Sequence, residues 1–271
     1  MSNSPQTAPA NPVVLETREH GIATVVMNRP ECLNSLNKEL AAGLDEAFTR
    51  LAKDESIRVV ILTGAGRAFC AGGDLNYLRR GRESGDVKQL EPLLRSGMQM
   101  ILKMRTMPQP VIAAVNGAAA GGGMNIALAA DIRIAAEEAT FGQSFAKVGL
   151  FPDYGGTYFL PQLAGPSNAA EMFYTGEMID SQTALRLGLV NRVVPSARLE
   201  AEVRTLAQKI AQGPTIAIAA AKRTLFGSQR QALETALENE VQQQMKCFSS
   251  QDCAEGLRAF FEKRRPKFEG H

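Results

Sequence analysis

The sequence has no tryptophan and only two histidines, His20 and His271. Its cysteines are few and scattered, and none forms a CxxC pair. A disulfide framework and a zinc site are therefore not expected, and we expect the chain to reside in a reducing cytoplasm. The four cysteines are Cys32, Cys70, Cys247 and Cys253.

An excess of charge of one sign is also lacking, because 30 Lys and Arg face 28 Asp and Glu, for a net charge of +2. This balance creates no global field toward nucleic acid or anionic lipid, so neither is expected as a partner. No apolar run reaches the ~20 residues of a membrane span. Residues 1–12, MSNSPQTAPANP, hold no Lys or Arg and no apolar run, which predicts a disordered tail and not a targeting segment.

The 271 residues, 45% of them hydrophobic, suffice for one large domain or for one domain with an appendage. Strands dominate the first half of the predicted structure and helices the second, which favours an α/β core with a helical C-terminal piece. Glycine-interrupted residues 79–86 are predicted to be a mobile connection. Strands are expected at 13–17, 22–27, 58–64, 110–117 and 131–136. Helices are expected at 37–53, 91–104, the run AGGGMNIALAA, 155–163, 166–175, 181–187, 201–212, 215–225, 232–248 and 251–264.

Two strand ends share one pattern, an apolar strand followed by a glycine-containing loop: VVILTGAGRAFCAGGDL and VIAAVNGAAAGGGMNIA. Glycines let bare backbone approach a ligand, and a helix start leaves N–H groups free. The loops do not fit a phosphate, because neither GxxxxGK[ST] nor GxGxxG is present. Two N–H groups that converge on one oxygen would stabilise an enolate or a tetrahedral intermediate. Two tight turns with close packing explain the pattern equally well.

Six ordered motifs resemble the enoyl-CoA hydratase/isomerase (crotonase) superfamily. Besides the two glycine loops they are NRPECLNSLNKEL, ATFGQ, GLFPDYGGTYFLPQLAG and TGEMIDSQTALRLGLVNRVV. The resemblance implies a crotonase-like spiral of ββα units over residues 13–195 and a helical trimerisation region over 196–271. It also implies homotrimers or dimers of trimers, and acyl-CoA thioester substrates that carry coenzyme A themselves, with no separate cofactor and no metal.

The resemblance further implies that backbone N–H groups of Gly73 and Gly122 hold the thioester oxygen. Arg29 and the basic C-terminal segment around Lys263 and Lys267 are weaker candidates for binding the phosphates of coenzyme A. The expected substrate-binding residues around the first loop are Ala71, Gly73, Asp74, Leu75 and Asn76.

The sequence departs from the two-glutamate pattern that the resemblance implies for a hydratase. Asn125 and Phe145 stand at the two positions, and neither side chain can act as a general base. Asn125 remains a candidate for hydrogen bonding to substrate, and Phe145 is expected to form an apolar pocket wall.

The nearest carboxylate within a motif is Asp153, in GLFPDYGGT, a segment that resembles family isomerases with a single acid near this point. It is expected to take a proton from one carbon of the acyl chain and return it to another through an enolate. The neighbouring Phe151, Pro152, Tyr154 and Phe145 are expected to raise its pKa by desolvation. A capping role at a helix that starts near residue 155 is the alternative.

The sequence favours an isomerase that shifts a double bond in an enoyl-CoA, and three alternatives stay open. They are a hydratase with a displaced catalytic acid, a non-catalytic acyl-CoA-binding protein, and a dehalogenase-like enzyme with a nucleophilic aspartate. The last lacks its expected partners, because the chain has no Trp and both histidines lie far from the motifs.

Overall fold

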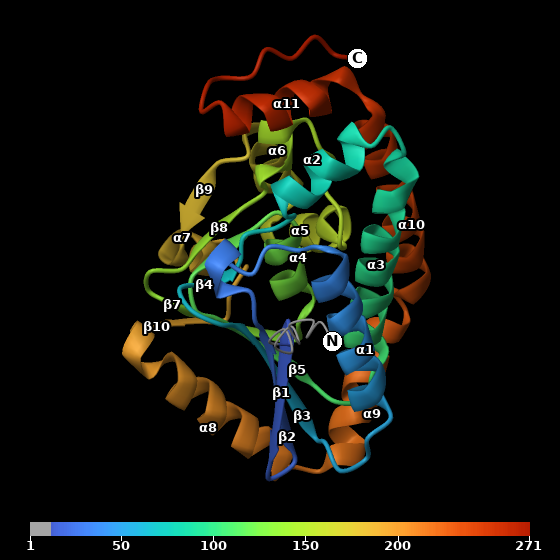
Figure 1. Cartoon of the computed structure of the whole chain (residues 1–271). Helices are drawn as coiled ribbons and strands as arrows, with labels where there is room; N and C mark the ends of the chain where they lie inside the picture. The colour runs from blue at the N-terminus through green and yellow to red at the C-terminus, as the bar shows by residue number, and fades with distance from the viewer. Residues whose placement is uncertain (1–11) are drawn as a thin grey trace, which may run out of the picture.

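Figure 1 shows the computed structural model, which describes residues 12–271; the predicted tail, apart from Pro12, lies outside these residues. The larger sheet has the order β1-β2-β3-β5-β7-β10 and is parallel except for the β1–β2 hairpin. Every residue of β5 is buried, as continuous apolar runs predict for a parallel strand covered on both faces. The strands span Val14–Glu19 (β1), Ile22–Met27 (β2), Val59–Gly64 (β3), Val111–Val115 (β5), Ile132–Ala136 (β7) and Arg192–Val194 (β10).

A second sheet of three-residue strands, in the order β4-β6-β8-β9, lies beside the first. The strands β3, β5 and β7 are each followed directly along the chain by a strand of this small sheet, so the predicted spiral of ββα units is confirmed. The small-sheet strands were not predicted, because three residues are too short to show a period. They span Ala68–Cys70 (β4), Ala118–Ala120 (β6), Thr140–Gly142 (β8) and Met178–Asp180 (β9).

The helices confirm the predicted helical segments to within a few residues at each end. Helix α1 begins after Asn37, whose side chain accepts a hydrogen bond from the Leu40 N–H. The helices of the first two thirds are α1 (Lys38–Ala52), α2 (Leu75–Glu83), α3 (Glu91–Thr106), α4 (Gly122–Ala129), α5 (Gly156–Ala164), α6 (Pro166–Thr175) and α7 (Ser181–Arg186). Those that follow β10 are α8 (Leu199–Ala211), α9 (Thr215–Gly227), α10 (Arg230–Ser249) and α11 (Gln251–Phe261). Short 3₁₀ turns are η1 (Pro30–Cys32), η2 (Val87–Leu90), η3 (Ser144–Val148) and η4 (Ser196–Arg198).

One predicted segment is wrong: most of residues 79–86 belong to helix α2. The Asp74 side chain accepts hydrogen bonds from the N–H groups of Asn76 and Tyr77 and so starts the helix. Gly81, which suggested a break, is buried, and a methyl group there would collide with Leu90. The glycine therefore serves close packing and not a flexible connection.

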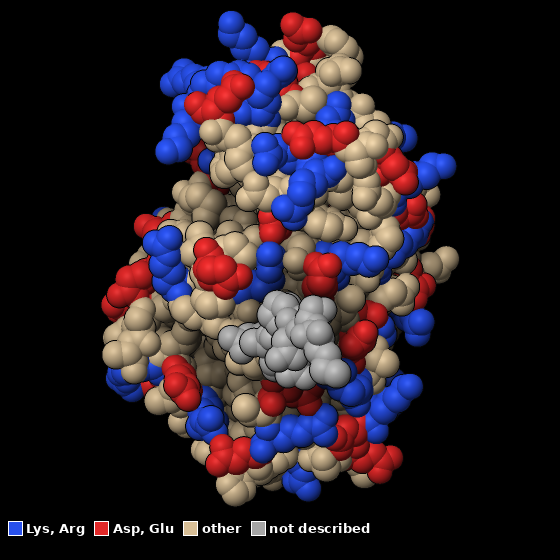
Figure 2. Space-filling view, viewed as in Figure 1, with Lys and Arg blue, Asp and Glu red and all other residues tan. Residues whose placement is uncertain are grey.

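Three of the four C-terminal helices, α8, α10 and α11, share one hydrophobic core with the sheets. Helix α8 packs on strands β2, β3, β5 and β7, while α10 packs on α3 and α5. In Figure 1, α10 runs alongside α3, and α11 crosses the end of the molecule above α2 and α6. Figure 2 shows acidic and basic side chains interspersed over the same face, with basic side chains gathered at the end where α11 lies.

The loop between β2 and α1 is fixed to the strand end after β3 by Asn34. This residue is fully buried and has a positive φ of 56°. Its Nδ2 donates to the carbonyls of Ala65 (2.9 Å) and Ala68 (2.8 Å), and its Oδ1 accepts from the N–H of Arg29 (2.9 Å). The same loop continues to Leu36, which pairs with Gly73.

We expect Asn34→Ala to lower the free energy of unfolding by about 2–4 kcal/mol, because buried backbone groups lose their partners. Urea unfolding measures this effect. Asn37→Ala, which removes only a helix cap, is the control and should cost about 1 kcal/mol. Equal losses in the two variants would contradict the role given to Asn34.

Candidate active site

The two glycine loops line one cavity of about 420 Å³. A methyl group added to Gly72 would lie 2.8 Å from the Ala120 carbonyl oxygen and 3.7 Å from the Gly121 Cα, so the backbones of the two loops are in contact. The sequence motifs that suggested a paired loop site, which lie about 50 residues apart, therefore meet in space. Of the predicted residues, the cavity is lined by Ala71, Gly73, Asp74, Leu75, Asn76, Gly122, Phe145 and Asp153.

Gly73 offers a free backbone N–H because its two neighbours, and not Gly73, make the backbone hydrogen bonds to Leu36. The Leu36 N–H donates to the Gly72 carbonyl (2.7 Å), and the Asp74 N–H donates to the Leu36 carbonyl (2.8 Å). In this parallel pairing the N–H of Gly73 itself points away from Leu36. Within residues 12–271 that N–H donates to no other group.

Gly122 is the first residue of α4, where an N–H has no acceptor within the helix. Its neighbour Gly121 has a positive φ of 50°, and the Gly121 N–H donates a hydrogen bond to the Gly142 carbonyl (2.8 Å). The Gly122 N–H has no such partner in the described part of the chain. It also carries the positive end of the helix dipole, which favours negative charge on a bound oxygen.

Arg29 does not line the cavity, and its expected role at the coenzyme A phosphates stays a prediction. Its guanidinium donates to the Ser35 carbonyl and pairs with Asp74 Oδ2 at 2.9 Å. Only 16% of the Arg29 side chain is exposed, and its positive charge is paired with the Asp74 carboxylate. Through this ion pair Arg29 joins the loop before α1 to the start of α2.

Asn125 also lies outside the cavity lining, so its expected contact with substrate stays a prediction. The side chain is fully buried. Its Nδ2 donates to the Asp153 carbonyl at 2.7 Å, and its Oδ1 accepts from Gln143 Nε2 at 2.6 Å. The amide therefore holds the backbone of the loop that carries Asp153, an action that uses both its donor and its acceptor.

Phe145 is an apolar cavity wall, as predicted. It follows the start of η3, is 7% exposed, and its ring lies beside Gly121. Further walls come from α2, α3, α10 and α11. The apolar lining includes Leu36, Leu78, Leu93, Leu94, Val148, Leu150, Phe248, Phe260 and Phe261.

Asp153 places its carboxyl group in this apolar cavity close to Gly122. A methyl group added to Gly122 would lie 3.3 Å from Asp153 Oδ1. Oδ2 accepts a hydrogen bond from Gln244 Nε2 at 3.0 Å, whereas Oδ1 is buried without a partner in the described residues. A carboxylate with one donor and little water is poorly stabilised. Burial accordingly raises the pKa of Asp153 from its ordinary value to about 8, the direction predicted.

The capping alternative for Asp153 is wrong, because another residue caps α5. Glu240 of α10 is 1% exposed, and its Oε2 accepts from the Gly155 N–H (2.7 Å). Its Oε1 accepts from the Thr157 N–H (2.9 Å) and hydroxyl. Burial raises the pKa of Glu240 to about 7, against the lowering effect of these three donors. The charge of Glu240 adds to the burial that raises the pKa of Asp153.

Sequence reasoning missed Glu240 and Gln244, which lie about 90 residues after Asp153. Both sit on the buried face of α10, together with Leu233, Leu237, Val241 and Phe248. Two polar residues four apart within an apolar helical stripe were the available signal, since a buried polar side chain must find a partner.

Tyr154 closes the loop beside Asp153 in a left-handed conformation, with φ of 54°. Its ring packs over Gly97 of α3, where a methyl group would collide with it, and its hydroxyl donates to the Leu93 carbonyl at 3.1 Å. A positive φ at a tyrosine is costly and persists only where surrounding contacts fix it. The loop around Asp153 is thus held from α3, α4 and α10.

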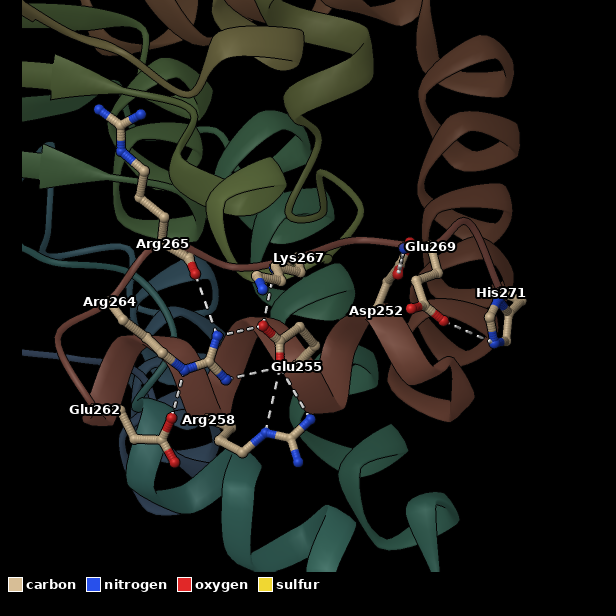
Figure 3. A network of polar contacts seen from close by, with 9 residues as sticks. All are labelled: Asp252, Glu255, Arg258, Glu262, Arg264, Arg265, Lys267, Glu269 and His271. Carbon is tan, nitrogen blue, oxygen red and sulfur yellow. Dashed lines mark hydrogen bonds and ion pairs between the residues drawn. The ribbon is translucent and has the colours of Figure 1, made fainter.

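The C-terminal segment folds back on α11 through Glu255 and Asp252 (Figure 3). Glu255 accepts from Arg258, from Arg264 and from the Lys267 N–H, and these donors hold the pKa of Glu255 well below its usual range. The side chains of Phe260 and Phe261 reach the cavity from the same helix. Binding of coenzyme A phosphates by Lys263 and Lys267 stays a prediction.

No helix among residues 12–271 is both long enough and apolar enough to cross a membrane. Within the same residues no three His, Cys, Asp or Glu side chains group as a metal ion would require.

A spiral of ββα units with two glycine loops meeting at one cavity defines a crotonase fold. The model of the family described as enoyl-CoA hydratase/isomerase matches residues 17–271, and the chain belongs to this family. A probable enoyl-CoA hydratase of Rhodobacter capsulatus is 41% identical over 92% of this chain and 95% of its own length. The 1,2-epoxyphenylacetyl-CoA isomerase of Escherichia coli is 38% identical over 95% of this chain and 98% of its own.

Solved structures agree with this placement. The crystal structure of an enoyl-CoA hydratase from Mycobacterium avium subsp. paratuberculosis K-10 superposes with a TM-score of 0.86 at 32% identity. The match covers 95% of this chain and 98% of that one.

The raised pKa of Asp153 predicts an effect on stability. Between the ordinary value of about 4 and the folded value of about 8, the folded protein keeps a proton that the unfolded chain releases. Stability from this group is therefore fully present below pH ~4 and is lost as the pH rises toward 8. We expect Asp153→Asn to melt like the parent near pH 4 and several degrees higher at pH 8, in thermal unfolding followed against pH.

Asp180→Asn is the matched control. The Thr183 N–H lowers the pKa of Asp180, so this substitution should give no stabilisation at pH 8. An Asp153→Asn protein that melts below the parent at pH 8 would contradict the conclusion that the Asp153 carboxyl group is desolvated and has a raised pKa.

Proposed function

We propose that this protein is an enoyl-CoA isomerase that shifts a double bond in an acyl-CoA thioester, with Asp153 as the acid/base. The observation that carries the proposal is the position of the Asp153 carboxyl group, next to Gly122 in the cavity that both glycine loops line. Asn125 and Phe145 occupy the positions where the family resemblance places the glutamates of a hydratase. One carboxyl group in an apolar site suits proton transfer between carbons better than the holding of a water molecule.

In the proposed reaction the thioester carbonyl oxygen accepts hydrogen bonds from the N–H groups of Gly73 and Gly122. The Asp153 carboxylate removes a proton from the carbon between the carbonyl and the double bond. The C–H electron pair forms the new double bond to the carbonyl carbon, and negative charge gathers on the oxygen as a dienolate. Protonated Asp153 then returns the proton to the far carbon of the original double bond, which leaves an isomer conjugated with the thioester. Two backbone donors at the developing oxyanion contribute several kcal/mol, roughly 3–4 for each donor.

The raised pKa supports a base that can also return its proton. A carboxylate with an ordinary pKa near 4 would be a weak base, whereas a value of about 8 approaches that of an efficient general base. The alternatives are a hydratase with a displaced acid, favoured by similarity to the probable enoyl-CoA hydratase of Rhodobacter capsulatus, and a non-catalytic acyl-CoA-binding protein.

We expect Asp153→Asn to reduce isomerase kcat by about 10²–10⁴-fold with a small change in KM, because the amide neither takes nor returns a proton. Conversion of a 3-enoyl-CoA into its 2-enoyl isomer, followed by absorbance of the conjugated thioester, measures this loss. For the parent protein, kcat/KM should rise with pH toward an apparent pKa near 8, since the ionised form starts the reaction.

Hydration of crotonyl-CoA is the comparison assay, and we expect a rate near zero. An Asp153→Asn protein that isomerises normally removes Asp153 from the mechanism. Efficient hydration of crotonyl-CoA favours the hydratase, and tight binding of acyl-CoA thioesters without turnover favours the binding protein.

No cofactor is needed in the proposed reaction beyond the coenzyme A of the substrate, because the same proton leaves and returns. We also propose that the protein acts in the cytoplasm, consistent with four free cysteines, two of them buried.

We propose assembly into a homotrimer or a dimer of trimers, supported by helix α9. Its sequence TIAIAAAKRTLFG is largely apolar, yet Lys222 is its only residue that the chain buries. Ile216 is 87% exposed and Leu225 is 64% exposed. An apolar helix left in water is typical of a surface that another copy covers.

We expect a mass of three or six times the 29.2 kDa chain in sedimentation equilibrium. Ile216→Asp should lower that mass toward the monomer, because a charge would be buried at the interface. Gln208→Asp, on the exposed side of α8, is the control and should leave it unchanged. A monomeric parent protein would contradict this assembly.

A further inference from the structure

The two carboxyl oxygens of Asp153 lie in unlike surroundings. Oδ2 accepts from Gln244 Nε2 at 3.0 Å, while Oδ1 has no partner among residues 12–271 and lies toward Gly122. A buried polar atom without a partner is rare in a folded protein and calls for an explanation. Here the unpaired oxygen borders the cavity in which the proposed proton transfer takes place.

Gln244 can present only its N–H₂ group to Asp153. Its Oε1 accepts from the Phe151 N–H at 2.9 Å, and a backbone N–H cannot pair with an amide N–H₂ group. Gln244 is 1% exposed, and a turned amide would lose both hydrogen bonds without water to replace them. The backbone two residues before Asp153 therefore fixes the direction of the donor that Asp153 receives.

We propose that Gln244 is a positioning residue that occupies Oδ2 of Asp153 and so reserves Oδ1 for the proton that the reaction moves. This inference rests on the proposed function. An amide N–H donates to Oδ2, so when Asp153 is protonated the hydrogen sits on Oδ1, directed away from Gln244. When Asp153 is ionised, the same N–H stabilises the carboxylate that starts the reaction. Without this donor both oxygens would compete for the proton, and the ionised form would be scarcer.

Other charged or titratable groups lie near Asp153 or line its cavity. Glu240 of α10 raises the pKa of Asp153, and Tyr154 lies next to it in the loop. Lys147 of η3 and Asp74 at the start of α2 line the same cavity. None of these groups hydrogen bonds to the Asp153 carboxyl group, so Gln244 is its one direct donor in the described part of the chain.

Two variants separate this role from mere support of the loop. Gln244→Met removes both the donor to Asp153 and the acceptor for Phe151. We expect kcat to fall about tenfold or more with KM for the enoyl-CoA within about threefold, because one hydrogen bond to a charged group is lost. The rising limb of the pH profile should move to higher pH, since the ionised form of Asp153 loses its donor.

Gln244→Glu keeps an acceptor for the Phe151 N–H but donates to Asp153 only while the new carboxyl group is protonated. We expect activity to be retained at low pH and lost at high pH, which adds a falling limb that the parent protein lacks. Gln242→Glu, the same change on the exposed side of α10, is the control and should keep the parent profile. Binding of butyryl-CoA, measured by calorimetry, reports whether each variant keeps the folded site.

A Gln244→Met protein with the parent kcat and pH profile would overturn the inference. So would a Gln244→Glu protein that follows the parent profile at every pH, because that result assigns Gln244 to loop support alone. If Gln244→Met fails to bind butyryl-CoA, the Gln244→Glu profile decides the question. Loss of activity in Asp153→Asn together with unaffected Gln244 variants rejects only this inference, whereas an active Asp153→Asn protein rejects the proposed function as well.

Discussion

The desolvated carboxyl group of Asp153 is the constraint on which the rest of the site depends. A carboxyl group surrounded by apolar side chains costs free energy unless it stays protonated or finds donors. Among residues 12–271 it has one donor, Gln244, and Oδ1 stays unpaired beside Gly122. Burial of this carboxyl group disfavours folding when it is ionised, but it raises the pKa to a value at which the group can both take up and release a proton.

Two residues of helix α10, Glu240 and Gln244, hold the loop that carries this carboxyl group in place. Glu240 receives three donors at the start of α5 and so satisfies the helix end that follows the loop. Gln244, one turn later, anchors the Phe151 N–H and contacts Asp153. Because Glu240 takes over the capping, the Asp153 carboxyl group is free to face the cavity. On the opposite side, Asn125 holds the Asp153 backbone.

Much of the fold could be predicted from the sequence, because its long strands and helices carry clear periods and punctuating glycines. The three-residue strands of the second sheet carry none, and Gly81 suggested a break although it serves close packing within α2. Within the site, Gly73, Gly122 and Asp153 were predicted from motifs. Contacts between distant segments could not be predicted, since nothing local shows that Gln244 meets a loop about 90 residues earlier. For the same reason the protein partners of Arg29 and Asn125 could not be predicted.

A crystal structure of the Asp153→Asn variant with a bound 3-enoyl-CoA would show whether the two glycine loops and residue 153 act on the same acyl group. We expect the thioester oxygen to lie within about 3 Å of the N–H groups of both Gly73 and Gly122. We also expect the residue 153 amide to lie against the carbon between the carbonyl and the double bond, with Gln244 on its far side. A carbonyl oxygen held elsewhere, or an acyl chain out of reach of residue 153, would show that Asp153 does not act on a thioester held by the two glycine loops.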